Sequence, residues 1–325
     1  MANAVTTGPV EMADGLFRVD WAIGTKPMAS YLLVGDDVAL IDAGIATTPA
    51  KVYRPAIEAL GRRVADVGML VITHADADHI GGTHAARGLF PNLMLACHHD
   101  DLHWASDPAT LTAERYDGFT PYGLRYDQET FDRLASWMGP RESIDTVLRA
   151  GERLPLGNAN LTVHHVPGHS PGHICLHEPA RDYALIGDAV FGRSQLDTDG
   201  GHLAAPPYDD VAAYRGSIAT LRRLAPELML GCHYPPMRGD EVTAFLDASE
   251  AWVDDATAFT ADLLAGAREP VSLARAIEAA NPVLGPYANP GELRWALRAH
   301  LEALVADRTA RHVEREGIIL WEATV

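Results

Sequence analysis

The chain has 325 residues and carries 26 lysine and arginine residues against 44 aspartate and glutamate residues, a formal net charge of −18. Hydrophobic residues make up 47% and charged residues 22%, as in ordinary globular proteins, which excludes a disordered or fibrous chain. The acidic balance argues against nucleic acid or an anionic membrane as the main partner. The 15 histidines are unevenly spread along the chain.

Cysteine usage and the N-terminal segment indicate the compartment. The three cysteines, Cys97, Cys175 and Cys232, are odd in number and far apart, so they do not form a disulfide framework. Glu11 and Asp14 lie where a secretory leader would be apolar, which predicts no signal peptide. No stretch approaches the roughly 18 apolar residues of a membrane span. We therefore expect a cytoplasmic protein.

Short strands and helices alternate through the first hundred residues, the pattern of a layered α/β domain. Strands are predicted at 16–21, 31–34, 38–41, 68–73 and 93–97, and helices at 49–60 and 79–87. The segment 68–73 is apolar and rich in β-branched residues without polar alternation, which is typical of a buried strand.

Residues 100–150 interrupt this alternation and are predicted to form a helical insertion. The segment is rich in aromatic side chains, namely Trp104, Tyr116, Phe119, Tyr122, Tyr126, Phe131 and Trp137. Two interpretations stay open. The aromatic residues either pack the insertion on the main body, or line a substrate pocket or a dimer interface, where such residues are favoured.

The second half of the chain continues with strands and then becomes helical. Strands are predicted at 161–166, 174–177, 183–187 and 228–230, helices at 209–224, 273–280 and 290–306, and a hairpin at 311–322. This order predicts a main domain over 1–240, with 100–150 as a cap, and a helical, winged-helix-like module over 241–325.

The segment 74–82, His-Ala-Asp-Ala-Asp-His-Ile-Gly-Gly, carries the strongest chemical signal and follows a predicted buried strand. In extended backbone, His74 and Asp76 point the same way and can converge on one point. Asp78 and His79 lie in a turn that can direct them to a neighbouring point. All four side chains are metal-binding types, and packing a core requires none of them.

Three further residues of these types each end or follow a predicted strand. His169 lies in Pro-Gly-His-Ser-Pro-Gly-His, Asp188 in Gly-Asp-Ala and His233 in Cys-His. His98, His99 and His103 follow another strand and are weaker candidates for a supporting position near the same edge.

These residues resemble the pattern of the metallo-β-lactamase-fold hydrolase superfamily, His-x-His-x-Asp-His followed by a histidine, a bridging aspartate and a last histidine. The resemblance covers about residues 16–240, and the Pro-Gly-His context is similar to the glyoxalase II and lactonase branches. It implies a four-layer αββα sandwich and two divalent metal ions. Asp42 falls where the family keeps a supporting aspartate, and the C-terminal residues resemble the winged-helix-like tail of some members.

The resemblance also implies a division of the metal ligands. One ion would be bound by His74, Asp76 and His169, the other by Asp78, His79 and His233, with Asp188 bridging them. In the family, such a pair of ions produces hydroxide that attacks a polarised carbonyl or phosphoryl group. Asp78 and Asp188 are both candidates for accepting the proton.

Asp76 departs from the family pattern, which has a histidine at this position. A third carboxylate lowers the Lewis acidity of the ions, and harder oxygen ligands favour iron or manganese over the zinc that the resemblance otherwise implies. The flavodiiron branch has a glutamate here and binds two irons. Alternatively, the shorter aspartate weakens or empties the first site.

The leading hypothesis is a dinuclear metallohydrolase of a small ester, thioester or lactone. The alternatives are a di-iron oxidoreductase that handles oxygen or nitric oxide, a nuclease, and a catalytically idle sensor. The tail from 271 to 325 lacks a basic surface, which argues against the nuclease. A small-molecule substrate is therefore the expected partner, with neither nucleic acid nor a membrane, and a homodimer is plausible by resemblance.

Overall fold

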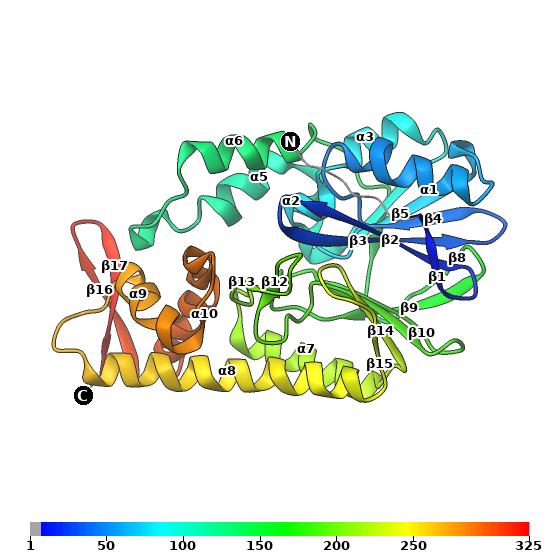
Figure 1. Ribbon diagram of the computed structural model, residues 1–325. Coiled ribbons are helices and arrows are strands. Elements are labelled where there is room, and N and C mark those ends of the chain that lie inside the picture. The colour runs from blue at the N-terminus through cyan, green and yellow to red at the C-terminus, as the bar shows by residue number, and fades with distance from the viewer. Residues whose placement is uncertain (1–7, 325) are drawn as a thin grey trace.

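The computed structural model describes residues 8–324 and shows two β-sheets packed face to face, with helices on both outer faces (Figure 1). The predicted four-layer αββα sandwich is thereby confirmed. Residues 1–7 and 325, assigned above to the main domain and the C-terminal module, lie outside the described residues.

The first sheet contains seven strands in chain order. They are β1 (Val10–Ala13), β2 (Leu16–Ile23), β3 (Lys26–Val34), β4 (Val38–Ile41), β5 (Val67–Val71), β6 (Met94–His98) and β7 (Thr146–Leu148). Strands β1 to β4 pair antiparallel, and β4 to β7 pair parallel. The sequence pattern does not predict β1 or β7, so the predicted insertion 100–150 contains one strand of this sheet.

The second sheet has the order β15-β14-β11-β10-β9-β8. Its strands are β8 (Arg153–Leu156), β9 (Ala159–His165), β10 (Ile174–Glu178), β11 (Tyr183–Gly187), β14 (Leu228–Gly231) and β15 (Met237–Arg238). Only β11 and β14 pair parallel. A small separate hairpin is formed by β12 (Gln195–Leu196) and β13 (His202–Ala204).

The space between the sheets is filled by alternate residues of the facing strands. Leu33 and Ile41 from the first sheet and Val163, Leu185 and Leu230 from the second belong to one buried apolar cluster. Each is at most 3% exposed. Because strand side chains alternate between faces, the residues between these positions pack against the outer helices instead.

Helices cover both outer faces of the sandwich (Figure 1). On the first sheet lie a π-helix (Pro49–Tyr53) that continues into α1 (Arg54–Ala59), a 3₁₀ turn (Val64–Asp66), α2 (Ala77–Ile80) and α3 (Thr83–Leu89). On the second sheet lie α7 (Val211–Leu224) and α8 (Asp240–Gly266). The strands and helices that were predicted therefore occur in the predicted order, while β8, β12, β13 and β15 were missed along with β1 and β7.

The insertion between β6 and β7 is helical, as expected. It contains α4 (Leu102–Ser106), α5 (Pro108–Leu111), α6 (Gln128–Trp137), a π-helix (Thr112–Tyr116) and 3₁₀ turns at His99–Asp101 and Thr120–Tyr122. Its aromatic residues pack on the C-terminal segment: Phe119 meets Trp295 edge-on at 4.6 Å, and Tyr122 stacks on Trp321 at 5.3 Å between ring centroids.

The C-terminal segment has the predicted order of helices and a hairpin. After α8 come α9 (Leu273–Leu284), a 3₁₀ turn (Pro290–Glu292), α10 (Leu293–Ala306), β16 (Ala310–Arg315) and β17 (Ile318–Ala323). Helix α8 also packs along α7 through ion pairs such as Arg215–Asp254 and Arg222–Asp247, so it belongs to the sandwich layer as much as to the tail. Within residues 8–324 no helix is both long and apolar enough to cross a membrane.

Candidate metal centre

The predicted site residues lie where strands of both sheets end. His74 closely follows β5 in the first sheet, while Asp188 and His233 follow the parallel strands β11 and β14 of the second. His169 lies in the loop between β9 and β10. Because neighbouring parallel strands end at one edge of a sheet, these side chains gather at one edge of the sandwich.

The segment that carries the motif turns sharply instead of forming one helix. Helix α2 covers only Ala77–Ile80, and α3 begins after a break of two glycines, so the predicted helix over 79–87 is interrupted. The amide of Gly82 donates to the carbonyl of Gly44 at 2.9 Å. A Cβ on Gly82 would lie 2.3 Å from the carbonyl oxygen of Ala43, so glycine allows this close approach.

The second subsite, defined as Asp78, His79 and His233, is buried beside Asp188. Oδ2 of Asp188 lies 2.9 Å from Nε2 of His233 and 3.4 Å from Nε2 of His79. Oδ2 of Asp78 lies 3.8 Å from Nε2 of His233. Cys232 joins His79, Asp188 and His233 in a group whose ligand atoms all lie within 4.8 Å of one another.

The first subsite, defined as His74, Asp76 and His169, adjoins the second at Asp188. His74, His169 and Asp188 form another group with ligand atoms within 4.8 Å of one another. Oδ2 of Asp76 lies 2.9 Å from Nε2 of His169 and 3.8 Å from Nε2 of His74. Asp188 is shared by both groups, which is the position that a bridging carboxylate requires.

Main-chain carbonyl groups orient two of the histidines. Nδ1 of His169 lies 2.6 Å from the carbonyl oxygen of Pro207, and Nδ1 of His233 lies 2.8 Å from that of Pro27. A carbonyl oxygen only accepts, so Nδ1 donates in both rings and Nε2 presents its lone pair to the centre. This outward hydrogen bond is typical of metal-binding histidines.

Asp42 orients the other two histidines, directly and through Thr73. Its Oδ2 accepts from Nδ1 of His79 at 2.8 Å and from the hydroxyl of Thr73 at 2.9 Å. The same hydroxyl lies 3.0 Å from Nδ1 of His74. Asp42 has a φ of 60°, and such strained backbone is often found at functional sites. The geometry thus gives Asp42 the supporting position that the resemblance implies.

Several buried ligand atoms lack hydrogen-bond partners. Among residues 8–324 these include Nε2 of His74, Nε2 of His79 and Oδ1 of Asp188. Leaving one such group unsatisfied costs about 1–3 kcal/mol, so three of them at this centre call for partners that the described residues do not supply. Imidazole nitrogens and carboxylate oxygens in this arrangement fit divalent zinc, iron or manganese.

Two cations pair with the motif carboxylates. Neither was predicted from the sequence. Nζ of Lys26 lies 2.6 Å from Oδ2 of Asp78, and Nε of Arg115 lies 2.6 Å from Oδ1 of Asp76. The hydroxyl of Tyr116 also donates to Oδ1 of Asp76, at 2.9 Å. Lys26 and Arg115 lie 52 and 39 positions from their partners and carry no motif, so no pattern in the sequence identifies them.

Burial and charge shift the pKa values of these groups. Burial alone would raise the pKa of Asp76, but the charge of Arg115 holds it well below the usual range of a carboxyl group. Burial likewise works against the charged form of Lys26, yet Asp78 and Asp188 raise its pKa above the ordinary value. Burial and the neighbouring histidines lower the pKa of His74 well below its ordinary value. At neutral pH the site therefore holds charged Asp76, Arg115 and Lys26 beside a neutral His74.

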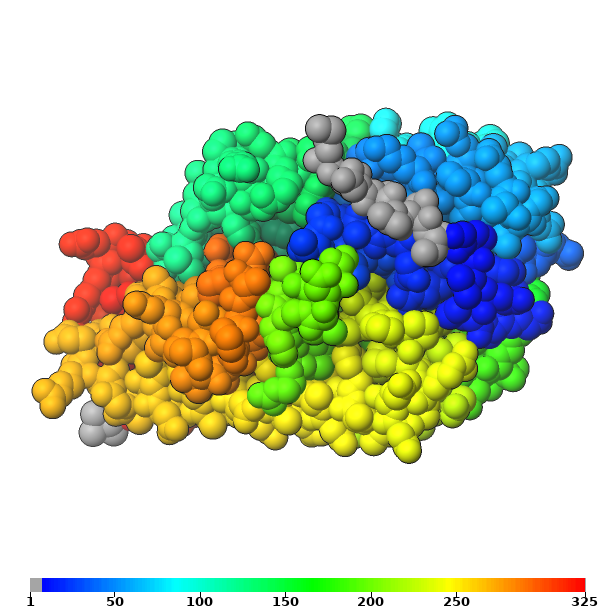
Figure 2. Space-filling model, in the orientation of Figure 1, coloured from blue at the N-terminus to red at the C-terminus, as the bar shows by residue number. Residues whose placement is uncertain are grey.

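A cavity of about 1020 Å³ opens onto both subsites. Its walls come from the sandwich, the insertion and the C-terminal segment, which approach one another on the face shown in Figure 2. Apolar and aromatic lining residues include Phe191, Tyr126, Trp137 and Trp295. The aromatic residues of the insertion therefore pack on the C-terminal segment as well as lining this cavity, and a substrate pocket here stays a prediction.

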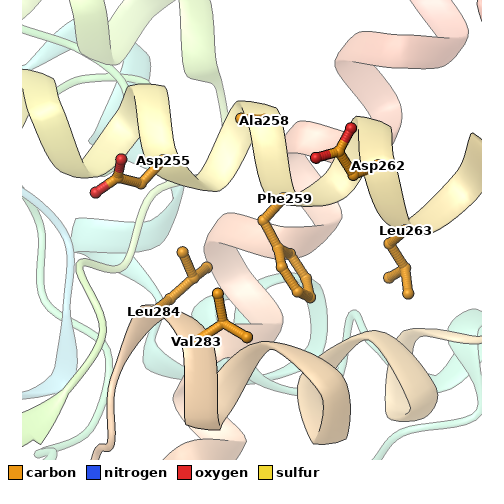
Figure 3. A pocket seen from close by; sticks show the side chains of 7 residues that line it. All are labelled: Asp255, Ala258, Phe259, Asp262, Leu263, Val283 and Leu284. Carbon is orange, nitrogen blue, oxygen red and sulfur yellow. The ribbon is translucent and has the colours of Figure 1, made fainter.

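A second hollow of about 600 Å³ lies between α8 and α9 (Figure 3). Asp255 and Asp262 border it together with apolar residues such as Phe259 and Leu284. It shares no lining residue with the cavity at the metal centre.

The weaker histidine candidates lie outside the centre. His98 stacks on His165 at 4.3 Å between ring centroids, and these two form a separate group with Asp100. Nδ1 of His99 lies 2.9 Å from Oδ1 of Asp100, and Nε2 of His103 lies 3.3 Å from Oε2 of Glu114. His173, in contrast, accepts from the amide of Asp188 at 3.0 Å and stacks on His74, so it supports the centre from behind.

Sequence comparisons connect this geometry to known proteins. A family model described as the metallo-beta-lactamase superfamily matches residues 24–233. Acyl-coenzyme A thioesterase MBLAC2 of Homo sapiens is 26% identical over 231 residues, which cover 66% of this chain and 74% of that protein. The Gallus gallus and Bos taurus proteins of the same name match over 51% and 50% of their length. Hydroxyacylglutathione hydrolase of Hyphomonas neptunium is 48% identical over 48 residues, 15% of this chain and 19% of that protein.

Two solved structures show the same fold over nearly the whole chain. A metallo-beta-lactamase family protein from Thermus thermophilus aligns with a TM-score of 0.75 at 21% identity, covering 97% of this chain and 100% of that one. A beta-lactamase domain protein from Burkholderia ambifaria aligns with a TM-score of 0.73 at 20% identity, covering 97% and 93%. At these identities the likeness concerns the fold alone.

Proposed function

This chain belongs to the metallo-beta-lactamase superfamily and is a metal-dependent hydrolase, and from that premise we propose that it cleaves a small thioester at a two-metal centre. His74, Asp76 and His169 would hold one ion and Asp78, His79 and His233 the other, with Asp188 between them. The observation that carries the proposal is the convergence of two groups of ligand atoms on Asp188. Simple esters and lactones remain alternatives as substrates.

The residues around the centre divide the work of hydrolysis. When bound, the ions supply Lewis acidity and an activated water. Oδ2 of Asp78 is engaged by Lys26, whereas Oδ1 of Asp188 has no hydrogen-bond partner among the described residues. The free Oδ1 of Asp188 suits a ligand between the two ions, and Asp78 and Asp188 both stay candidates for accepting the proton. The aromatic side chains of the cavity exclude bulk water from the substrate.

The relatives and the cavity together favour a thioester. Relatives named acyl-coenzyme A thioesterase and hydroxyacylglutathione hydrolase match this chain. The cavity offers an apolar wall for an acyl group and the exposed cations Lys51 and Arg133 for an anionic thiol portion. Its volume is at the upper end of typical ligand sites, which suits an acyl group and its carrier together.

The di-iron alternative rested on the extra negative charge of Asp76 and on its harder oxygen donor. Arg115 offsets that charge within the protein, so the charge no longer distinguishes a redox centre from a hydrolytic one. Zinc, which the resemblance to the superfamily implies, is the ion we propose for both subsites. The absence of nucleic acid as a partner, a homodimer and a cytoplasmic location stay predictions.

The proposal is tested by metal analysis and thiol release. Protein purified without added metal is expected to contain two zinc ions per chain and to release free thiol from acyl thioesters. Treatment with a chelator should abolish the release, and added zinc should restore it. His233→Asn should lose one ion and most of the activity, whereas His312→Asn, an exposed histidine paired with Glu302, should lose neither.

Other outcomes would contradict the proposal. Two irons with an absorption band that responds to oxygen would support the redox alternative instead. Faster cleavage of lactones than of thioesters would keep the centre and change the substrate. Full thioesterase activity in metal-free protein would exclude the metal mechanism.

A further inference from the structure

Asp76 is bonded by more side-chain donors than the other two carboxylates of the centre. Its Oδ1 accepts from Nε of Arg115 at 2.6 Å and from the hydroxyl of Tyr116 at 2.9 Å. Its Oδ2 accepts from Nη2 of Arg115 at 3.1 Å and also faces His169 and His74. One oxygen is thus directed toward the insertion and the other toward the first subsite.

Arg115 is itself fixed in place. Its side chain is only 2% exposed, and its Nη1 donates to Oδ2 of Asp209 at 2.7 Å. The guanidinium lies over the ring of Trp295 at 4.8 Å and near that of Trp104 at 5.7 Å. A buried guanidinium is tolerated only when it is paired, and here two carboxylates and two aromatic rings surround it.

The charges of Asp76 and Arg115 cancel at the point where the family pattern has a neutral histidine. An aspartate alone would add a negative charge to the first subsite, and an arginine alone would place a buried cation beside a divalent ion. Together they offer the metal one oxygen ligand and no net charge. A neutral imidazole likewise offers one nitrogen ligand and no net charge.

We infer that Arg115 is a positioning residue that makes Asp76 an effective substitute for a histidine in the first subsite. It binds Oδ1 through Nε and Oδ2 through Nη2, which holds Oδ2 facing His74 and His169, and it offsets the carboxylate charge. This inference rests on the proposed two-metal centre. It predicts that Asp76 and Arg115 are coupled. A substitution of either residue alone should weaken metal binding at the first subsite, whereas Asp76→His combined with Arg115→Gln should not.

The test is a double-mutant cycle of metal affinity on the full-length protein. Zinc stoichiometry and stepwise affinity are measured against a chromophoric chelator, with His169→Asn and His233→Asn identifying which step belongs to which subsite. Arg115→Gln and Asp76→His alone are each expected to weaken the first-subsite affinity about 10–100-fold. Asp76→His combined with Arg115→Gln is expected to recover most of that loss.

The insertion supplies a matched control. Arg125 forms an exposed ion pair with Asp117 in the same segment, at 2.8 Å, so Arg125→Gln should leave both affinities unchanged. Arg115→Lys keeps the charge but loses the two-pronged geometry, and its affinity is expected to lie between wild type and Arg115→Gln. Circular dichroism and the melting temperature show that each variant is folded, and Arg115→Lys replaces Arg115→Gln in the cycle if the latter does not fold.

Two results overturn the inference in distinguishable ways. Two ions in the wild type with additive penalties in the double variant would remove Arg115 from the first subsite and leave the two-metal proposal intact. A single ion in the wild type, bound with unchanged affinity in Arg115→Gln, would contradict the two-metal centre itself and the inference with it.

Discussion

The two subsites of the centre are supported from different parts of the molecule. In the second subsite, the outward bonds of His79 and His233 end on Asp42 and Pro27, and Lys26 pairs with Asp78. All three supports belong to the first sheet or its loops. The sandwich therefore builds this subsite by itself.

The first subsite depends on segments outside the sandwich strands. Asp76 is held by Arg115 and Tyr116 of the insertion, and Arg115 is held in turn by Asp209. Asp209 is also paired with Arg298 on α10 of the C-terminal segment. The first subsite therefore depends on the insertion and the tail, and these segments can tune it without altering the second subsite.

Asp188 joins the two subsites, so its loss should have the largest effect. Asp188→Asn removes the negative charge shared by both groups of ligand atoms and should lower kcat/KM about 10³-fold or more, with less than one zinc retained per chain. The measurements are thiol release and elemental analysis. Asp255→Asn, an acid at the second hollow and 51% exposed, is the control and should behave as wild type. Two ions and substantial activity in Asp188→Asn would mean that the subsites are independent.

The difference in how the two subsites are supported also explains which site residues could be predicted from the sequence. His74, Asp78, His79, Asp188 and His233 all follow strand ends within local motifs, and the structure brings them together. The succession of strands and helices followed from apolar runs and turn residues, whereas the αββα layers followed from the resemblance to the superfamily.

What escaped prediction are contacts between segments remote in sequence. Lys26, Arg115 and Tyr116 occur in no motif, and only the folded insertion brings Arg115 to Asp76. The sequence therefore shows the negative charge of Asp76 but not the cation that offsets it, because that cation lies 39 residues away. Strand β7 was missed for a similar reason: three residues form a strand only because β6 offers an edge to pair with.

Asp42→Asn should weaken zinc binding at the second subsite more than at the first. Asparagine tolerates the left-handed backbone at this position but carries no charge for Nδ1 of His79. The second-subsite zinc affinity is expected to fall about 10–100-fold, as for other residues that orient metal ligands. Stepwise zinc titration measures this. Because Thr73 relays Asp42 to His74, a smaller loss in the first subsite is also expected, and equal losses would contradict the division.

Arg298→Gln should weaken the first subsite slightly and leave the second unchanged. The change removes one partner of Asp209 and leaves Arg115 with a less fixed carboxylate. Since this pair is partly exposed, its loss corresponds to at most about 1 kcal/mol, or roughly a fivefold weaker first subsite. Second-subsite affinity should not change. Arg311→Gln, which breaks an exposed pair with Glu322 in the C-terminal hairpin, is the matched control.

His300→Gln should reduce the loss of stability that acid causes, whatever stability the variant has at neutral pH. Burial lowers the pKa of His300 to about 3, while its ring nitrogens contact Tyr208 at 2.7 Å and Thr257 at 3.2 Å. The unfolded chain binds this proton near pH 6.5 and the folded chain does not. The folded protein therefore loses stability as the pH falls below about 6.5, by roughly 2 kcal/mol at pH 5.

Urea unfolding of wild type and His300→Gln between pH 7.5 and 5 measures this difference, because protonation of the metal ligands is common to both proteins. The variant should lose less stability over this range, and His312→Gln, which replaces an exposed histidine of the same segment, should follow the wild type. Since α10 carries both His300 and Arg298, acid should loosen the support of the first subsite before that of the second. Parallel unfolding curves for wild type and His300→Gln would show that the tail does not confer this sensitivity.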